Sequence, residues 1–201
     1  MTQLFLASRN PKKLTELRRM LSASAPHVEV LGIDDVAPYE EPAETEHTFE
    51  GNALIKARAG AAATRLPALA DDSGICIDAL NGMPGVLSAR WAGRAKDDTA
   101  NNELVLEQLR GTPEERRGAE FRCAVALCLP NGREHVECGV LRGRVRTFMQ
   151  GSNGFGYDVL FTAEGESRTN AEMSDEEKDA ISHRGQALRA IAPRVAAWLA
   201  T

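Results

Sequence analysis

The chain has 201 residues, of which 43% are hydrophobic and 26% charged, and its formal net charge is −5. This length predicts one globular domain, and the negative charge argues against nonspecific binding to nucleic acid. A polyphosphate ligand would therefore need a local cluster of cations or a metal. No apolar run approaches the roughly 18 residues of a membrane span, and no signal-peptide pattern is present, so we expect a cytoplasmic protein without nucleic-acid or membrane partners. The four cysteines lack metal-type spacing, which predicts reduced thiols.

A strand, a loop and a helix are predicted near the start of the chain. Residues 4–7 form a short apolar run, and a helix is expected from Pro11 with Asn10 as its N-cap. Free backbone N–H groups at a helix start attract anions, and Lys13 adds a positive charge there. The segment predicts an anion site, although a capped surface helix with solvated lysines fits the same pattern.

An acidic, proline-containing loop is predicted over residues 34–46, after a strand at 27–31. A helix follows from about Thr48, in which Thr48, Asn52 and Lys56 recur at i, i+4 and i+8. This polar line is either a solvent-facing stripe or the lining of a cleft. The alanines on the adjacent face indicate close packing, so the lining of a cleft fits the pattern at least as well as a solvent-facing stripe.

Two consecutive carboxylates, Asp71 and Asp72, lie between short apolar runs in the segment 70–74. Ser73 and Gly74 follow them, which predicts a tight turn. Adjacent side chains of extended backbone point to opposite sides, so Asp71 and Asp72 are expected to hold different roles, such as metal ligand and proton acceptor. Asp, Ser and Gly are also ordinary turn formers, so the segment alone leaves both interpretations open.

A long β-hairpin is predicted in the middle of the chain, after a Gly/Pro loop at 82–93 and a helix. Apolar residues alternate over 121–129, and a return strand runs over about 134–146. The dipeptide at 131–132 is Asn-Gly, which indicates a type I′ turn.

Glycines surround an aromatic residue in the segment 151–158. They let the backbone approach a ligand, with the ring of Phe155 free to stack on a planar group, although a glycine-rich turn anchored by a core aromatic fits equally. Residues 174–177 form a capping box that predicts a short helix to about 181. The Ser-His-Arg-Gly run at 182–185 then offers several hydrogen-bond donors before a last amphipathic helix.

Six motifs follow one another in order along the chain. They are Ser8-x-Asn10-x-x-Lys13, Thr48-Phe49-x-x-Asn52-Ala53-x-x-Lys56-Ala57, Ala70-Asp71-Asp72-Ser73-Gly74, Pro84-Gly85-x-x-Ser88-Ala89-Arg90, Phe155-Gly156-Tyr157-Asp158 and Ser182-His183-Arg184-Gly185. This succession resembles the inosine triphosphate pyrophosphatase family, which acts on deaminated purine nucleoside triphosphates, and the resemblance covers essentially the whole chain.

The resemblance implies an α/β fold with a long, twisted, mixed β-sheet flanked by helices. Residues 1–201 would form a single domain with two lobes and a central active-site cleft, and the protein would be a homodimer that uses Mg²⁺. The implied reaction is attack of water on the α-phosphorus of ITP, dITP or XTP, which releases the nucleoside monophosphate and pyrophosphate. A metal agrees with the need of an acidic protein to neutralise a triphosphate locally.

The resemblance also implies roles for individual residues. Asp72 corresponds to the general base, and Glu44 and Asp71 correspond to the metal ligands. The implied phosphate-binding residues are Ser8, Asn10, Lys13 and Lys56. The implied base- and ribose-binding residues are Ser73, Phe155, Gly156, Tyr157, Asp158, Lys178, His183 and Arg184.

The implied base pocket is rich in donors. Hypoxanthine and xanthine carry a 6-oxo acceptor where adenine carries an amino group, so donors such as His183 and Arg184 should disfavour adenine. Two positions depart from the family pattern: Glu46 replaces a glycine and Val159 replaces a proline. The first departure adds a carboxylate near the metal and leaves open which acid of residues 40–46 completes its site.

Two other functions fit part of the sequence. One is a nucleotide pyrophosphatase of the septum-inhibitor (Maf-like) family, against which the Phe-Gly-Tyr-Asp and His-Arg-Gly motifs argue. The other is a non-catalytic nucleotide-binding regulator. Presence of both Asp71 and Asp72 favours an enzyme, because binding alone needs no general base.

Overall fold

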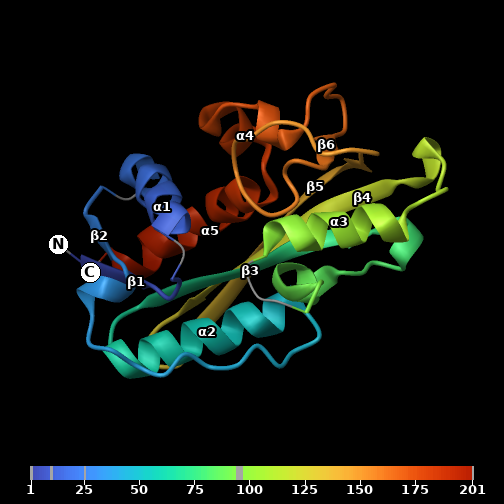
Figure 1. Cartoon of the computed structure of the whole chain (residues 1–201). Coiled ribbons are helices and arrows are strands. Elements are labelled where there is room, and N and C mark those ends of the chain that lie inside the picture. Colours follow the sequence, from blue (N-terminus) through green and yellow to red (C-terminus); the bar gives the residue numbers. More distant parts are fainter. Residues whose placement is uncertain (1, 10, 25, 94–96, 201) are drawn as a thin grey trace. The chain divides into compact units, whose positions relative to one another are not determined.

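The computed structural model describes residues 2–9, 11–24, 26–93 and 97–200. The strands are β1 (Thr2–Leu6), β2 (Val28–Leu31), β3 (Ala68–Ile77), β4 (Gly118–Cys128), β5 (Glu134–Val145) and β6 (Phe161–Ala163) (Figure 1). The helices are α1 (Pro11–Ser24), α2 (Phe49–Thr64), α3 (Asp98–Gln108), α4 (Asp175–Ile181) and α5 (His183–Leu199).

The six strands form one sheet in the order β2-β1-β3-β4-β5-β6. β1 pairs in parallel with β2 and with β3, whereas β5 and β6 pair antiparallel. The prediction of an α/β fold with a mixed sheet flanked by helices is therefore confirmed.

The chain divides into two compact units. The first unit comprises Met1–Asp72, Cys123–Cys138 and Gln186–Thr201, and the second comprises Ser73–Arg122 and Gly139–Gly185. Each unit has its own apolar core. The division falls within β3, β4 and β5, so Asp72 and Ser73, which are consecutive in the chain, belong to different units.

In the first unit, α1 connects the parallel strands β1 and β2, which cannot be joined by a tight turn (Figure 1). Leu17 and Leu21 on α1 are 1% and 2% exposed and pack in one cluster with Leu4 and Leu6 of β1. These leucines form the apolar face that packs α1 on the sheet.

Helix α2 packs closely because its inward residues are small. Ala53, Ala57 and Ala61 are buried, and a Cβ added at Gly60 would lie 3.0 Å from the ring of Phe5. Thr48 caps the helix, since its side chain accepts a hydrogen bond from the Gly51 N–H. The predicted start of this helix and its close-packed alanine face are both confirmed.

In the second unit, α3 packs on an aromatic core. Val105 of α3 and Leu109, which caps the C-terminal end of this helix, are fully buried, and they cluster with Phe121 and Phe161, whose ring centroids lie 4.6 Å apart. The capping box at Ser174 starts α4 as predicted.

The predicted turn at residues 70–74 is wrong, because these residues lie within the continuous strand β3. β3 is hydrogen-bonded between β1 and β4, and these long-range pairings outweigh the local turn preference of Asp, Ser and Gly. Gly74 does not form a turn; it allows the segment that contains Gly85 and Ser88 to pack closely against β3. A Cβ at Gly74 would lie 2.4 Å from both the Gly85 carbonyl oxygen and Ser88 Oγ.

The hairpin between β4 and β5 is confirmed, but its turn is not type I′. The Gly132 N–H donates to the Leu129 carbonyl, so the turn spans Leu129–Gly132 with Pro130 at its second position. Among the described residues of this turn only Gly132 has a positive φ, 86°, whereas a type I′ turn needs two. Proline fixes φ near −65°, which favours a type I turn closed by the glycine.

All four cysteines are free thiols, as predicted. Within the described part of the chain, no helix combines the length and the apolar character that crossing a membrane requires.

Candidate active site

Asp71 and Asp72 are both nearly buried on β3, at 5% and 7% exposure, and they meet different partners. The Asp71 carboxylate accepts a hydrogen bond from Lys13 Nζ at 2.7 Å. The Asp72 carboxylate accepts from Asn52 Nδ2 at 3.1 Å, and Lys56 Nζ lies 3.5 Å from its other oxygen. Lys13 belongs to α1 and Asn52 and Lys56 to α2, which agrees with the expectation that consecutive strand residues serve different sides.

Lys13 is not a solvated surface lysine. Its side chain is only 17% exposed, and its ammonium group pairs with Asp71. Ser8 lies just after β1, where its N–H donates to the Leu6 carbonyl. Asn10, the predicted N-cap, lies outside the described residues.

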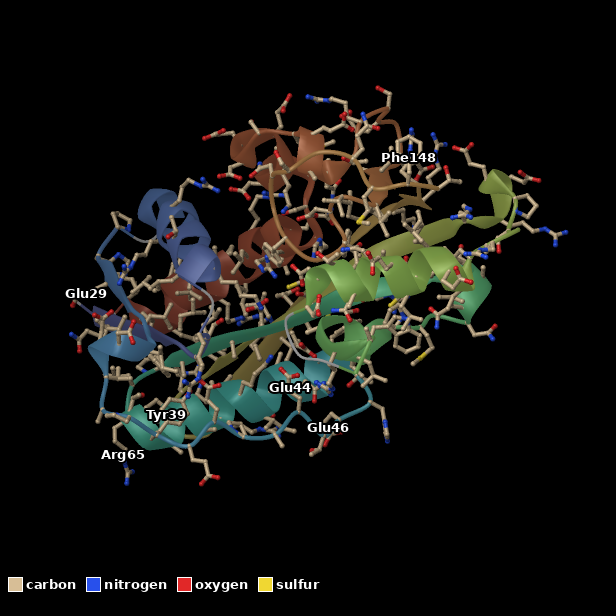
Figure 2. All side chains as sticks on the ribbon, viewed as in Figure 1. Glu29, Tyr39, Glu44, Glu46, Arg65 and Phe148 are labelled. Carbon is tan, nitrogen blue, oxygen red and sulfur yellow. The ribbon has the colours of Figure 1, made fainter. Side chains whose placement is uncertain are left out.

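Two members of the predicted polar line, Asn52 and Lys56, face acidic groups and not solvent, whereas Thr48 is exposed. Asn52 is 1% exposed, and Lys56 Nζ donates to Glu44 at 2.7 Å in addition to its contact with Asp72. Figure 2 shows Glu44 and Glu46 on the loop that leads into α2. The Glu46 N–H donates to Asn52 Oδ1 at 3.0 Å, so the loop is hydrogen-bonded to the helix. Of these two acids, Glu44 is the one whose carboxylate meets Lys56.

Burial and neighbouring charges both shift the pKa values of Asp72 and Lys56. Burial raises the pKa of Asp72; the positive charge of Lys56 opposes this shift, while the charges of Glu44 and Asp71 add to it. Burial alone would lower the pKa of Lys56, but the carboxylates around it outweigh burial and raise the pKa. Lys56 therefore remains protonated, and several negative charges share a small volume that a cation would stabilise.

Carboxylates are the groups here that could hold a metal. Glu44, Asp71 and Asp72 provide hard oxygen donors, and Mg²⁺ typically binds through one or two carboxylates together with substrate phosphates and water. Over the described ranges, no three His, Cys, Asp or Glu side chains form a ready metal cluster. Burial is the main cause of the raised pKa of Asp72, and the charges of Glu44 and Asp71 add to it, so a bound cation would stabilise the charged form of these oxygen donors.

In the second unit, an exposed aromatic ring lies near two cations. Phe155 is 38% exposed, with Lys178 Nζ 5.0 Å and the Arg184 guanidinium carbon 5.4 Å from its ring centroid. Arg184 also donates to Ser73 Oγ at 3.1 Å. An exposed ring flanked by donors can stack on a planar heterocycle and hydrogen-bond its edge.

Asp158 is buried and holds the residues around Phe155 in place through hydrogen bonds. It is 3% exposed, and one carboxylate oxygen accepts from Lys178 Nζ at 2.6 Å and from the Phe155 N–H at 2.9 Å. Its other oxygen accepts from Asn170 Nδ2 at 3.3 Å. A Cβ at Gly154 would lie 2.3 Å from this carboxylate, which is why a glycine is required there.

Tyr157 and His183 are buried instead of exposed. The Tyr157 hydroxyl donates to the Ser88 carbonyl at 2.8 Å, and burial raises the pKa of Tyr157, so it stays a donor. The His183 ring, 7% exposed, stacks on Phe121 with centroids 4.9 Å apart. Ser182 Oγ accepts from the Gly185 N–H and so caps the start of α5, which presents Arg184 in its first turn.

The structure adds residues whose roles the motifs did not reveal. Asn52 was part of a polar line without an assigned role, and it proves to contact Asp72. Asp98 and Asn102 of α3 bond the backbone of Gly156. The sequence contained a pattern that could have indicated these two residues. Asp98 and Asn102 precede Val105 on the same helical face, so polar residues occupy positions where an apolar stripe would be expected.

These contacts define an α/β protein with two groups of polar side chains: part-buried lysines meet carboxylates in the first unit, and an exposed phenyl ring lies beside cationic donors in the second. The description "Ham1 family" belongs to the family model that matches residues 4–194. The dITP/XTP pyrophosphatase of Nocardia farcinica is 56% identical over 98% of this chain and 96% of that protein. The dITP/XTP pyrophosphatase of Streptomyces coelicolor is 54% identical over 97% of this chain and 98% of that protein.

Solved structures agree. A nucleoside-triphosphatase/dITP/XTP pyrophosphatase from Mycobacterium abscessus matches with a TM-score of 0.80 and 54% identity over 96% of this chain and 100% of that one. A HAM1 protein from Coxiella burnetii matches with a TM-score of 0.89 and 40% identity over 97% of this chain and 98% of that one. The chain belongs to the Ham1 family, and the resemblance identified from its motifs is confirmed.

Proposed function

We infer that the protein is a nucleoside triphosphate pyrophosphatase that hydrolyses deaminated purine nucleotides, dITP or ITP and XTP or dXTP, to the monophosphate and pyrophosphate. The activity named for its relatives at 52% to 57% identity supports this inference. Removal of these nucleotides cleanses the nucleotide pool.

The observation that carries the mechanism is the different set of partners around two consecutive carboxylates. Asp71 meets Lys13, whereas Asp72 meets Asn52 and Lys56. We assign Asp71 to the metal and Asp72 to the attacking water. Asp72 accepts a proton from water while the water oxygen bonds to the α-phosphorus. The bond from the α-phosphorus to the oxygen that bridges it to the β-phosphorus breaks, and pyrophosphate departs.

The cations of the first unit provide the phosphate contacts in this proposal. Lys13 and Lys56 are fixed by carboxylates, so their ammonium groups are already in place when phosphate oxygens arrive. Ser8 and Asn10 complete the phosphate-binding set by family resemblance. Mg²⁺ is the proposed metal; Glu44 and Asp71 would hold it, and it would neutralise phosphate charge.

Recognition of the base falls to the second unit. Phe155 stacks on the purine, and donors of Lys178, His183 and Arg184 meet the 6-oxo group, which adenine lacks. Ser73, Gly156, Tyr157 and Asp158 shape this group, the last through its bonds to Lys178 and Phe155. The single domain with two lobes and a central cleft, the homodimer and the cytoplasmic location remain predictions that rest on the sequence.

A substrate panel tests the function. The purified protein is incubated with dITP, XTP, dGTP and dATP in the presence of Mg²⁺, and the released phosphate species is identified. We expect pyrophosphate and a monophosphate from dITP and XTP, with dATP slower by a large factor. Release of orthophosphate would contradict the mechanism, and equal rates on dATP would contradict the specificity. Binding without turnover would instead indicate a regulator.

A further inference from the structure

Gly156, the residue after the exposed ring of Phe155, is bonded at both of its backbone polar groups by α3. Its N–H donates to Asp98 Oδ2 at 2.7 Å, and its carbonyl accepts from Asn102 Nδ2 at 2.9 Å. Asp98 and Asn102 are four residues apart and therefore lie one turn apart on one face of α3. The helix thus grips a single residue of the loop, and through it two consecutive peptide groups, from two positions.

This grip fixes the backbone that carries a partly exposed ring. Phe155 is 38% exposed, so contacts with neighbouring side chains restrain it only in part. Its own N–H is bonded to Asp158, and Gly156 adopts a left-handed φ of 62°, which favours glycine. The backbone on both sides of the ring is therefore fixed, on one side by Asp158 and on the other by α3.

Helix α3 is itself anchored in the core of the second unit. Val105 of α3 is fully buried in the core of the second unit. Asn102 is 2% exposed, and its amide nitrogen also donates to the Asp98 carbonyl at 2.7 Å, which leaves its side chain little freedom. The neighbouring Asn101 accepts from the Ala92 N–H at 2.8 Å, so α3 also holds the preceding loop.

We propose that Asp98 and Asn102 are positioning residues for purine binding. They act by holding the backbone of Gly156, which places the ring of Phe155 before the ligand binds. The proposal rests on the proposed function in one respect, namely that Phe155 stacks on the substrate base. A ring that is held in its binding orientation before the ligand arrives loses less conformational entropy on binding. Such an effect is equal in the ground state and the transition state, so loss of the grip raises KM and leaves kcat largely unchanged.

Three variants separate this role from general support of the helix. Asp98→Ala removes the acceptor of the Gly156 N–H, whereas Asp98→Asn retains an oxygen acceptor of the same size. Asp97→Ala is the matched control, because Asp97 is the N-cap of α3, accepts from the Ala100 N–H and has no role in the grip. Loss of a cap lowers helix stability, so Asp97→Ala shows the effect of a less stable α3 without loss of the bond to Gly156.

The kinetic readout is KM and kcat for dITP hydrolysis. We expect Asp98→Ala to raise KM about tenfold with kcat within about twofold of the unsubstituted protein, which corresponds to loss of one hydrogen bond to a charged group. Asp98→Asn should recover most of that affinity. Asp97→Ala should lower Tm but leave KM unchanged. Equal KM values for Asp98→Ala and Asp97→Ala would overturn the assignment.

Amide hydrogen exchange provides a readout that does not depend on activity. Peptides that cover residues 151–158 should exchange faster in Asp98→Ala than in Asp97→Ala, because only the first variant frees the Gly156 N–H. If the unsubstituted protein failed to hydrolyse dITP, the proposed function would fail, and exchange would still decide whether α3 orders the loop. Unchanged exchange in Asp98→Ala would refute the grip itself.

Discussion

Replacing Asp72 by asparagine removes the proposed general base while it keeps the size of the side chain. A positioned general base contributes roughly 10²- to 10⁴-fold in rate, which is about 3 to 5 kcal/mol of transition-state stabilisation. We therefore expect kcat for dITP to fall by roughly that factor. The phosphate contacts of Lys13 and the stacking of Phe155 are untouched, so KM should change little.

The contacts of Asp72 indicate that the variant folds. Lys56 stays paired with Glu44 at 2.7 Å when its longer 3.5 Å contact with Asp72 is lost, and an amide oxygen can still accept from Asn52. Burial raises the pKa of Asp72, so the folded protein binds this proton more tightly than the unfolded chain. The contribution of Asp72 to stability then decreases as the pH rises from the usual Asp range through its raised pKa. Above that pKa the asparagine removes a buried charge, and Tm should not fall.

The assay is pyrophosphate release from dITP, with Tm measured by differential scanning fluorimetry at pH 7.5 in EDTA. Asp34→Asn, which neutralises an exposed aspartate of the same unit, is the control and should match the unsubstituted protein. Near-normal turnover of a folded Asp72→Asn protein would refute the assignment of the base. A large fall in Tm would refute the reasoning about its burial.

Three further predictions follow from individual contacts. Lys13→Met should destabilise the protein by roughly 3 kcal/mol in urea unfolding, because the buried Asp71 carboxylate loses its lysine; adding Asp71→Asn should recover most of this, and an unaltered unfolding midpoint in the single variant would count against the pair. Phe155→Leu should raise KM for dITP roughly tenfold with little change in Tm, because the ring is 38% exposed; an unchanged KM would argue against stacking. Burial raises the pKa of Cys128 to about 11, so iodoacetamide at pH 8 should alkylate the exposed Cys138 first, and mass spectrometry showing equal rates would be the contrary result.

The elements that local sequence encodes were predictable. The cap at Thr48, the alanine face of α2 and the capping box at Ser174 each depend on residues within one or two helical turns, and all three appear as expected. The two turns that were predicted wrongly depend on more than local preference. Residues 70–74 extend because strands on both sides pair with β3, and Pro130 selects a turn that the Asn-Gly signal alone does not reveal.

The candidate site shows the same limit. The motifs pointed to Asp71, Asp72 and Lys56, and spacing on β3 and α2 was enough to suggest separate roles. The pairing of Lys13 with Asp71 joins residues that are 58 positions apart, so no periodicity could reveal it. Asp98 is likewise 58 positions from Gly156, and its role becomes visible only when α3 and the loop are seen together.

In the proposed reaction, water attacks the α-phosphorus of a deaminated purine triphosphate. Hydrolysis of dITP in water enriched in oxygen-18, followed by mass spectrometry of both products, tests it directly. We expect one labelled oxygen in the monophosphate and none in the pyrophosphate. Label in the pyrophosphate would place the attack at the β-phosphorus and contradict the roles given to Asp71 and Asp72.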